Sequence, residues 1–266
     1  MNLLIKTKVG NGYNKVFDLG EYNMRLTTFG ILQLPKCEEF KSNTGEFEVA
    51  LVLLGGKCKV EGTDFCFDSV GKRKNVFDGL PYTVYLPRRT EYKITGITET
   101  MDLAVNISPA SKDTSKPAVI TPEMTKSISI GRDNFTRSAT IILSEKFNSE
   151  HFYIGEGMIP SGNWSGYPPH RHDYDNLPTE INMEETYFYR FNPGQGFGIQ
   201  KVYTPDGPID ETYTVKNNDT VAIAEGFHPL CGAPGYDMYY LWTMAGKNNR
   251  GLISAIDPDH RWVLDK

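Results

Sequence analysis

Two histidines separated by one residue, His170 and His172, are the first feature of the sequence that could do chemistry. Alternate residues of an extended strand point to the same side, so both imidazoles would face one space. Pro168 and Pro169 restrict the backbone directly before them. Imidazole binds Zn, Mn, Fe, Co and Ni ions, so the pair predicts a metal site. Such pairs are also common on surfaces, and the prediction therefore needs further ligands.

A carboxylate at the start of an aromatic segment supplies one of these ligands. Glu185 begins a segment in which Tyr187, Tyr189 and Phe191 would share its face of a strand. A carboxylate on such a face needs a charge partner when it is buried, and a metal ion would be one. The adjacent Glu184 must point the opposite way, so at most one of the two acids is a ligand. A solvated acid at the start of a strand is the alternative.

The third histidine of the proposed set is His228, which follows an apolar segment at 221–224 in a turn-like context. Alone, it could simply cap a turn. Together with His170, His172 and Glu185, it predicts a mixed nitrogen and oxygen site that leaves positions open for a substrate. We expect one divalent ion, Zn²⁺, although Mn²⁺, Fe²⁺, Co²⁺ and Ni²⁺ suit the same ligands.

Strand patterns dominate the elements that must position these residues. Aromatic residues reach 12%, and 25 glycines and 16 prolines favour strands joined by turns. No segment keeps a helical repeat of apolar residues, so the chain is expected to be all-β. The expected strands are 47–54, 57–60, 83–86, 92–94, 101–107, 139–143, 152–158, 185–191, 197–203, 211–215, 221–224 and 238–244.

A polar segment bounded by prolines, 108–117, divides the pattern and predicts two domains, 1–115 and 116–266. The halves resemble each other at an offset of 137 residues, which matches 83–91 with 220–228 and Glu48 with Glu185. At that offset the histidines fall on other residue types, namely Gln33, Pro35 and Glu91. The N-terminal domain is therefore expected to lack metal ligands.

Composition and charge argue against several classes of protein. The net charge is −5 and no long basic run occurs, which gives no support to a nucleic-acid or anionic-membrane partner. The N-terminus turns polar too early for a signal peptide, and no apolar run approaches the length of a membrane span. The four cysteines form no CxxC pair. We therefore expect a cytoplasmic protein with free thiols.

Longer motifs connect these residues to known proteins. The His-x-His, Glu and later His resemble the two motifs of the cupin superfamily. More narrowly, the chain resembles the 5-deoxy-glucuronate isomerase family of myo-inositol degradation, which is related to 5-keto-4-deoxyuronate isomerase. The resemblance runs nearly from end to end, in segments 77–87, 162–173, 175–178, 184–193, 195–204, 210–212, 226–229, 235–240 and 257–262. The spacing between His172 and Glu185 is longer than in 5-keto-4-deoxyuronate isomerase, which favours the family of the inositol pathway. One departure from the family's pattern is Arg89 in the N-terminal domain, where glycine is usual.

The resemblance implies a bicupin fold of two tandem double-stranded β-helix (jelly-roll) barrels with a metal in the C-terminal barrel. His170, His172, Glu185 and His228 fall on the family's ligand positions. The implied reaction is a metal-dependent aldose–ketose isomerisation of 5-deoxy-D-glucuronate to 5-dehydro-2-deoxy-D-gluconate. The metal would stabilise an enediolate, and a base would move a proton between neighbouring carbons.

Which residue is the base stays open at this point. The candidate catalytic residues are Lys201, Glu211, Tyr187 and Tyr240, and each of them has a structural alternative as a solvated or core residue. Arg190 or Lys201 could bind the substrate carboxylate, but strand alternation places Arg190 opposite Glu185.

Other functions also remain open. The alternatives are another cupin sugar-acid isomerase, a cupin dioxygenase, and a non-enzymatic sugar-binding cupin. A homo-oligomer is expected, because exposed sheet edges often pair between subunits.

Overall fold

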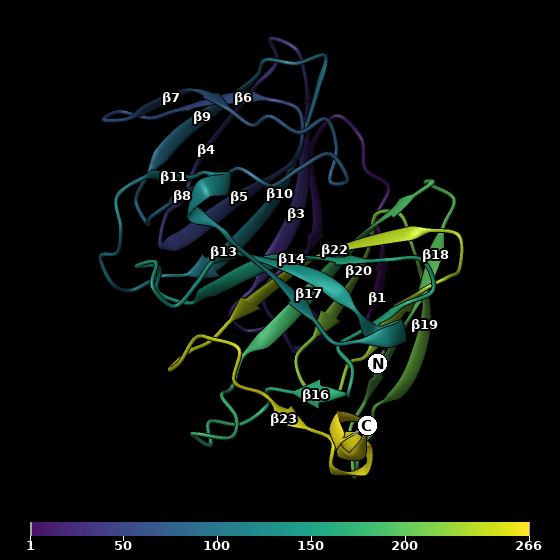
Figure 1. The fold of residues 1–266 in the computed structure, drawn as a ribbon. Coiled ribbons are helices and arrows are strands. Elements are labelled where there is room, and N and C mark those ends of the chain that lie inside the picture. The colour runs from purple at the N-terminus through teal and green to yellow at the C-terminus, as the bar shows by residue number, and fades with distance from the viewer. Residues whose placement is uncertain (1, 266) are drawn as a thin grey trace.

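Strands make up nearly all of the regular structure in the computed structural model, which describes residues 2–265 (Figure 1). The helices within this range are four 3₁₀ segments: Glu21–Asn23, Pro122–Met124, Asp133–Phe135 and Pro258–Asp265. The all-β prediction is thus confirmed. No helix among the described residues is both long and apolar enough to cross a membrane.

The first half of the chain contributes ten strands to two sheets. They are β2 (Gly12–Phe17), β3 (Thr28–Pro35), β4 (Glu39–Asn43), β5 (Phe47–Gly55), β6 (Cys58–Glu61), β7 (Cys66–Val70), β8 (Thr83–Leu86), β9 (Glu91–Gly96), β10 (Thr100–Pro109) and β11 (Ala118–Ile120). The large sheet has the order β11-β8-β5-β10-β3-β2, and the small sheet has the order β4-β9-β6-β7.

The second half repeats this plan and adds a short pair of strands. Its strands are β12 (Lys126–Ile130), β13 (Arg137–Leu143), β14 (Phe152–Ile159), β15 (Trp164–Ser165), β16 (His170–Arg171), β17 (Glu184–Asn192), β18 (Phe197–Tyr203), β19 (Asp210–Lys216), β20 (Asp219–Ile223), β21 (Leu230–Gly232), β22 (Asp237–Ala245) and β23 (Ala255–Ile256), joined by β1 (Leu4–Lys6). The large sheet has the order β1-β20-β17-β22-β14-β13-β12, the small sheet β15-β21-β18-β19, and β16 pairs with β23.

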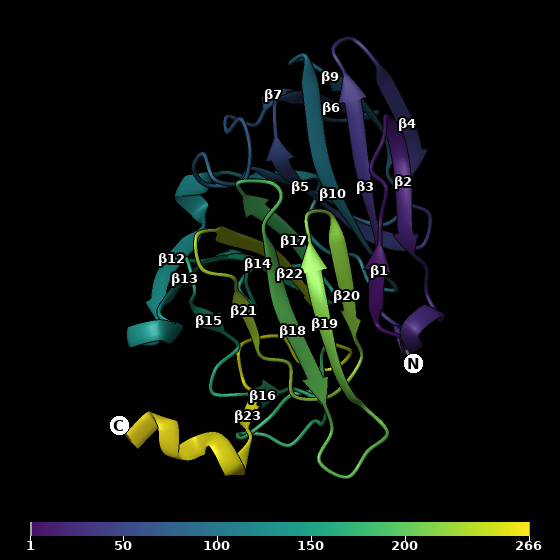
Figure 2. The same cartoon turned by 90° about the vertical axis from the view of Figure 1, so that its right-hand side faces the viewer.

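One strand from each side of the predicted boundary pairs with the large sheet of the other half. The N-terminal β1 pairs with β20, and Figure 2 shows the purple strand beside the green one. Conversely, β11, which lies beyond the predicted boundary at residue 115, pairs with β8 and so joins the large sheet of the first half. The predicted boundary near residue 115 stays a prediction, and strand pairing crosses it in both directions.

The two large sheets pack face to face, and each small sheet covers the outer face of its own large sheet. In β5, Val49, Leu51 and Leu53 pack inside the first half, whereas Ala50 and Val52 pack between the halves. Because both faces of β5 are covered, its pattern is a continuous apolar run.

β17 follows the same plan in the second half. Tyr187 and Tyr189 pack inside that half, and Phe188 packs between the halves. Both faces of β17 are therefore covered as well.

Strand pairing corrects the match between the halves. Val49 pairs with Leu86 in β8, and Glu185 pairs with Ile223 in β20, so Val49 rather than Glu48 is the counterpart of Glu185. A slip of one residue moves a side chain to the opposite face of a sheet, and Glu48 accordingly faces the other half.

The match of His170 and His172 to Gln33 and Pro35 is also wrong. Both Gln33 and Pro35 lie in β3, whose place in the sheet corresponds to β14. Residues 44–46 join β4 to β5, whereas residues 166–183 lie between β15 and β17. The first two histidines are thus carried by a segment that is much longer in the second half.

Candidate metal centre

Glu185 reaches the interior of the second half because it lies on the inward face of β17. The neighbouring Glu184 points the other way and accepts hydrogen bonds from the backbone N–H groups of Arg25 and Leu26, each at 2.7 Å. The prediction that the two acids point in opposite directions is therefore confirmed. Glu185 shares its face with Tyr187, which packs in the core of this half.

Three of the predicted ligands converge around this carboxylate. One ligand atom each of His172, Glu185 and His228 lies within 4.8 Å of the others, and all three residues are buried. Nε2 of His172 is 3.0 Å from Glu185 Oε2, and Nε2 of His228 is 3.1 Å from the same oxygen. Such a cluster of two imidazoles and one carboxylate matches the ligand types of a divalent metal site.

The backbone fixes which nitrogen of each ring faces the cluster. His172 Nδ1 bonds to the carbonyl oxygen of Met183, and His228 Nδ1 lies 2.7 Å from the carbonyl oxygen of Gly226. A carbonyl can only accept, so each Nδ1 carries a proton and each Nε2 is the nitrogen that faces the centre and can bind a metal ion. This is the usual arrangement around histidine ligands of metal ions.

His170 lies at the edge of the same cluster. Its strand β16 pairs with β23, at the lower end of the second half in Figure 1. The His170 ring centroid is 5.0 Å from that of His228 and 6.5 Å from that of His172. Its nitrogens fall outside the tight group of three and make no hydrogen bond within residues 2–265. The imidazole is therefore available as a further ligand.

The electrostatics of the cluster favour the metal-binding protonation states of Glu185 and His170, whereas the pKa of His172 is raised, because its contact with Glu185 outweighs burial. Burial alone would raise the pKa of Glu185, but the imidazoles of His172 and His228, whose Nε2 atoms lie 3.0 and 3.1 Å from Glu185 Oε2, lower it to about 2. Burial lowers the pKa of His170 to about 3, and the neighbouring His228 and His172 lower it further. A carboxylate and a neutral imidazole are the forms that bind divalent ions.

A divalent ion would also provide a partner for a buried nitrogen of His228. Nε2 of His228 is buried and has no hydrogen-bond partner with acceptable geometry within residues 2–265. A buried polar atom without a partner is costly, and coordination would satisfy it. The residues therefore fit the metal that the sequence predicts.

Two of the four predicted catalytic residues line the cavity beside the cluster. This cavity has a volume of about 90 Å³, and its walls include Tyr187 and Tyr240. The Oη of Tyr240 is 2.7 Å from Ser165 Oγ. Burial raises the pKa of both tyrosines, so both phenols keep their protons at neutral pH.

The other two predicted catalytic residues do not line this cavity. Lys201 lies on the partly exposed face of β18, where its Nζ is 2.5 Å from Asp210 Oδ1. Glu211 lies in β19, opposite Val202 of β18. The predicted roles of Lys201 and Glu211 stay predictions.

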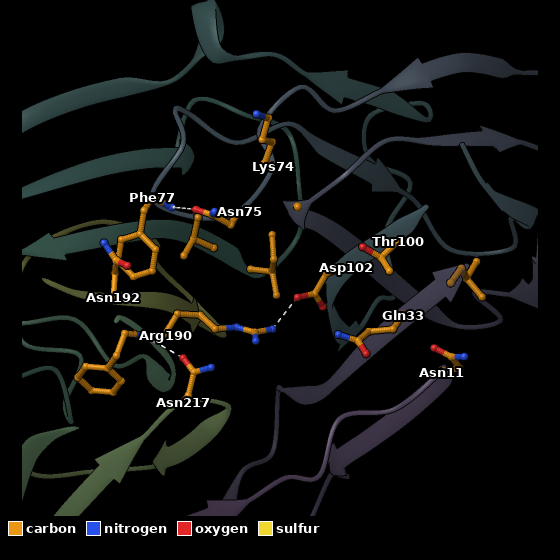
Figure 3. A pocket seen from close by; sticks show the side chains of 15 residues that line it. Asn11, Gln33, Lys74, Asn75, Phe77, Thr100, Asp102, Arg190, Asn192 and Asn217 are labelled. Carbon is orange, nitrogen blue, oxygen red and sulfur yellow. Dashed lines mark hydrogen bonds and ion pairs between the residues drawn. The ribbon is translucent and has the colours of Figure 1, made fainter. Parts of the chain in front are cut away.

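Arg190, considered above for the substrate carboxylate, lies in a different cavity. Figure 3 shows it pointing toward Asp102 of the first half, and the closest nitrogen–oxygen distance is 2.6 Å. That cavity lies between the halves and has a volume of about 380 Å³. The strand-alternation argument against Arg190 at the metal centre is therefore supported.

Sequence reasoning missed the polar cavity residues Arg137, Ser165 and Ser254. Arg137 begins β13, two residues before the predicted strand at 139–143. Alternation places Arg137 on the same face as Ala139, and extending that strand by one pair would have found it. Ser165 lies in the two-residue strand β15, which is too short to leave a periodic signal.

A family model describes almost the whole chain, because the KduI/IolB family model matches residues 3–263. The chain belongs to the KduI/IolB family. A relative from Geobacillus kaustophilus named 5-deoxy-glucuronate isomerase is 39% identical over 239 residues, which cover 89% of this chain and 85% of the relative. The protein of the same name from Bacillus subtilis strain 168 is 34% identical over 97% of this chain and 96% of its own length. On this similarity the family member described here is an isomerase.

Solved structures agree with the family assignment. The crystal structure of an IolB-like protein from Salmonella typhimurium LT2 has a TM-score of 0.92 and 32% identity, covering 99% of this chain and 100% of that one. An oxalate decarboxylase from Lactobacillus farciminis has a TM-score of 0.67 at 10% identity, covering 94% of this chain and 88% of its own. The second likeness shows the fold alone, which is all-β with cupin-like neighbours.

Proposed function

We propose that this protein converts 5-deoxy-D-glucuronate into 5-dehydro-2-deoxy-D-gluconate in myo-inositol degradation. The observation that carries the proposal is the convergence of His172, Glu185 and His228 beside a buried cavity. Family membership supports the choice of substrate, because relatives that cover most of the chain are named 5-deoxy-glucuronate isomerase.

The proposed metal ligands are His170, His172, Glu185 and His228, and the proposed ion is Zn²⁺, with Mn²⁺, Fe²⁺, Co²⁺ and Ni²⁺ as alternatives. His170 is included because its ring lies against that of His228 and has no other polar partner within residues 2–265. A divalent ion there would act as a Lewis acid on the substrate's carbonyl and neighbouring hydroxyl groups.

The residues of the chain would bind and orient the sugar. An aldose–ketose isomerisation moves one proton from the hydroxyl-bearing carbon to the aldehyde carbon and one from the hydroxyl to the carbonyl oxygen. Tyr187 and Tyr240 keep their protons and can donate hydrogen bonds to substrate oxygens. The buried wall of the cavity would exclude water during proton transfer. The sequence also predicts Lys201 and Glu211 for the proton transfer, but neither lines the cavity, so the proposal gives the catalytic roles to Tyr187 and Tyr240.

We further propose that each half is one barrel of a bicupin, with domains 1–115 and 116–266. The strands of the two halves follow matching orders in their sheets, which supports this arrangement. A homo-oligomer and a cytoplasmic location complete the proposal.

The test is an assay of the purified protein on 5-deoxy-D-glucuronate before and after chelation, with the metal identified by elemental analysis. We expect one bound divalent ion, a loss of activity of about 100-fold or more on chelation, and recovery with Zn²⁺. Parallel assays use 5-keto-4-deoxyuronate and measure oxygen consumption. Faster turnover of 5-keto-4-deoxyuronate, uptake of oxygen, or no turnover with the metal fully loaded would each contradict the proposal.

A further inference from the structure

Arg137 is a buried cation without a buried anion to match it. Arg137 is 9% exposed. Among residues 2–265, no carboxylate lies within ion-pair distance of its guanidinium. The contrast with Arg73 and Arg190 is clear, because they pair with Glu156 at 3.0 Å and Asp102 at 2.6 Å. Burying an unpaired charge is costly, so its retention at this position calls for a reason.

The hydrogen bonds of Arg137 hold one edge of the guanidinium and leave the other free. Nη1 donates to the carbonyl oxygen of Phe135 at 3.1 Å and, more weakly, to that of Tyr167 at 3.5 Å. Nε and Nη2 make no hydrogen bond within the described chain and keep some access to solvent, and Arg137 lines the cavity. An edge of two parallel N–H groups matches a carboxylate in a bidentate pair.

The surroundings of Arg137 leave room for its guanidinium beside the cavity. The turn before β13 contains Gly131, whose φ is +79°, and a Cβ there would lie 2.9 Å from Arg137 Nη1. The same Cβ would lie even closer to the Phe135 carbonyl oxygen, so glycine leaves room both for this carbonyl and for the guanidinium that donates to it. The hydroxyl groups of Ser165 and Tyr240, 2.7 Å apart, line the same cavity.

The carboxylate that lines this cavity already has partners of its own. Glu185 is the one carboxylate among the described residues that line the cavity, and it is held by His172 and His228. The Arg137 charge is therefore left for a group that enters from solution.

We propose that Arg137 binds the carboxylate of the substrate and makes the enzyme select sugar acids over neutral sugars. This inference rests on the proposed function and adds a residue to it. The substrate's reactive carbonyl and its carboxylate lie at opposite ends of the molecule. The metal cluster and Arg137, as separate parts of one cavity wall, suit such a two-ended substrate.

The experiment compares Arg137→Met and Arg137→Lys with the unchanged protein on two substrates. One is 5-deoxy-D-glucuronate, and the other is 5-deoxy-D-glucose, which has an alcohol in place of the carboxylate. For Arg137→Met we expect kcat/KM on the acid to fall about 100-fold, mainly through KM, and activity on the neutral sugar to change less than about 3-fold. Arg137→Lys should recover part of the loss, since it keeps the charge without the fork.

A binding measurement separates this inference from the proposed reaction. Calorimetry uses 2-deoxy-D-gluconate, which cannot isomerise, and its amide as the uncharged match. Arg137→Met should bind the acid at least about 30-fold more weakly and the amide unchanged, with full metal content. The matched control is Arg132→Met, an exposed arginine of the same turn, which should bind both compounds normally.

The two proposals fail in different ways. If the unchanged protein does not isomerise 5-deoxy-D-glucuronate, the proposed reaction fails, and calorimetry still decides the role of Arg137. Equal losses for the acid and the neutral compound, or a fall in melting temperature with no selective loss, would make Arg137 a structural residue and overturn the inference.

Discussion

The two halves share one frame of strands, yet only the second holds a cluster of potential ligands among the described residues. Where Glu185 points into the second half, Val49 points into the first. Where residues 166–183 bring His170 and His172 to the cavity, residues 44–46 form a short connection. A metal centre in this frame therefore needs two changes, an inward carboxylate and a longer loop that carries imidazoles.

The acid of the first half shows what the same residue type does on the opposite face. Glu48 is fully buried and accepts hydrogen bonds from the backbone N–H groups of Glu150 and His151, each at 2.8 Å, and from Tyr85 Oη at 2.7 Å. It joins the two halves rather than binding a metal. The comparison teaches that the face of the strand, more than the residue type, decides the role of a carboxylate.

The most direct test of this comparison replaces Glu185 with valine, the residue type at the corresponding position 49 of the first half. Glu185→Val should abolish metal binding and lower activity about 1,000-fold or more, because the anionic ligand is lost while the site stays apolar and packed. Elemental analysis measures the metal content of this variant, and kinetics measure its activity. Full metal content in Glu185→Val would contradict the proposed centre.

His170→Ala should have a smaller effect, about 10- to 100-fold on metal affinity, since three converging ligands remain. Elemental analysis and kinetics measure the effect of this variant as well.

A smaller effect, on stability rather than chemistry, is expected from the acid of the first half. Glu48→Ala leaves the backbone N–H groups of Glu150 and His151 without their acceptor and removes one partner of the Tyr85 hydroxyl, which keeps Thr114, and should cost about 3 kcal/mol of unfolding free energy. Urea denaturation measures this cost. The folded variant should keep its full metal content, and a selective loss of metal would mean that Glu48 acts on the centre after all.

The smallest effects are expected at the two predicted catalytic residues that lie outside the cavity lining. Lys201→Ala and Glu211→Gln should each change kcat/KM by less than about 3-fold and stability by about 0.5 kcal/mol or less, as for ordinary surface substitutions. Kinetics and thermal melting measure them. A loss of 100-fold in either variant would show that the residue reaches the substrate, as the strand pattern alone first suggested.

Local patterns determined much of this protein in advance. Apolar and aromatic segments between turns predicted the twelve expected strands, all of which correspond to strands of the structure. Strand alternation separated Glu184 from Glu185, because neighbouring side chains in a strand must face opposite ways. The residue types of the histidines and Glu185 then indicated a metal site with nitrogen and oxygen ligands.

Only the tertiary structure decided how distant segments meet. A match of the halves without gaps could not detect the long segment 166–183 or the one-residue slip at Glu48, since register depends on strand pairing. The exchange of β1 and β11 between the sheets left no local signal. The lone charge of Arg137 was equally hidden, because a sequence shows that an arginine is present, whereas the absence of its partner is a property of space.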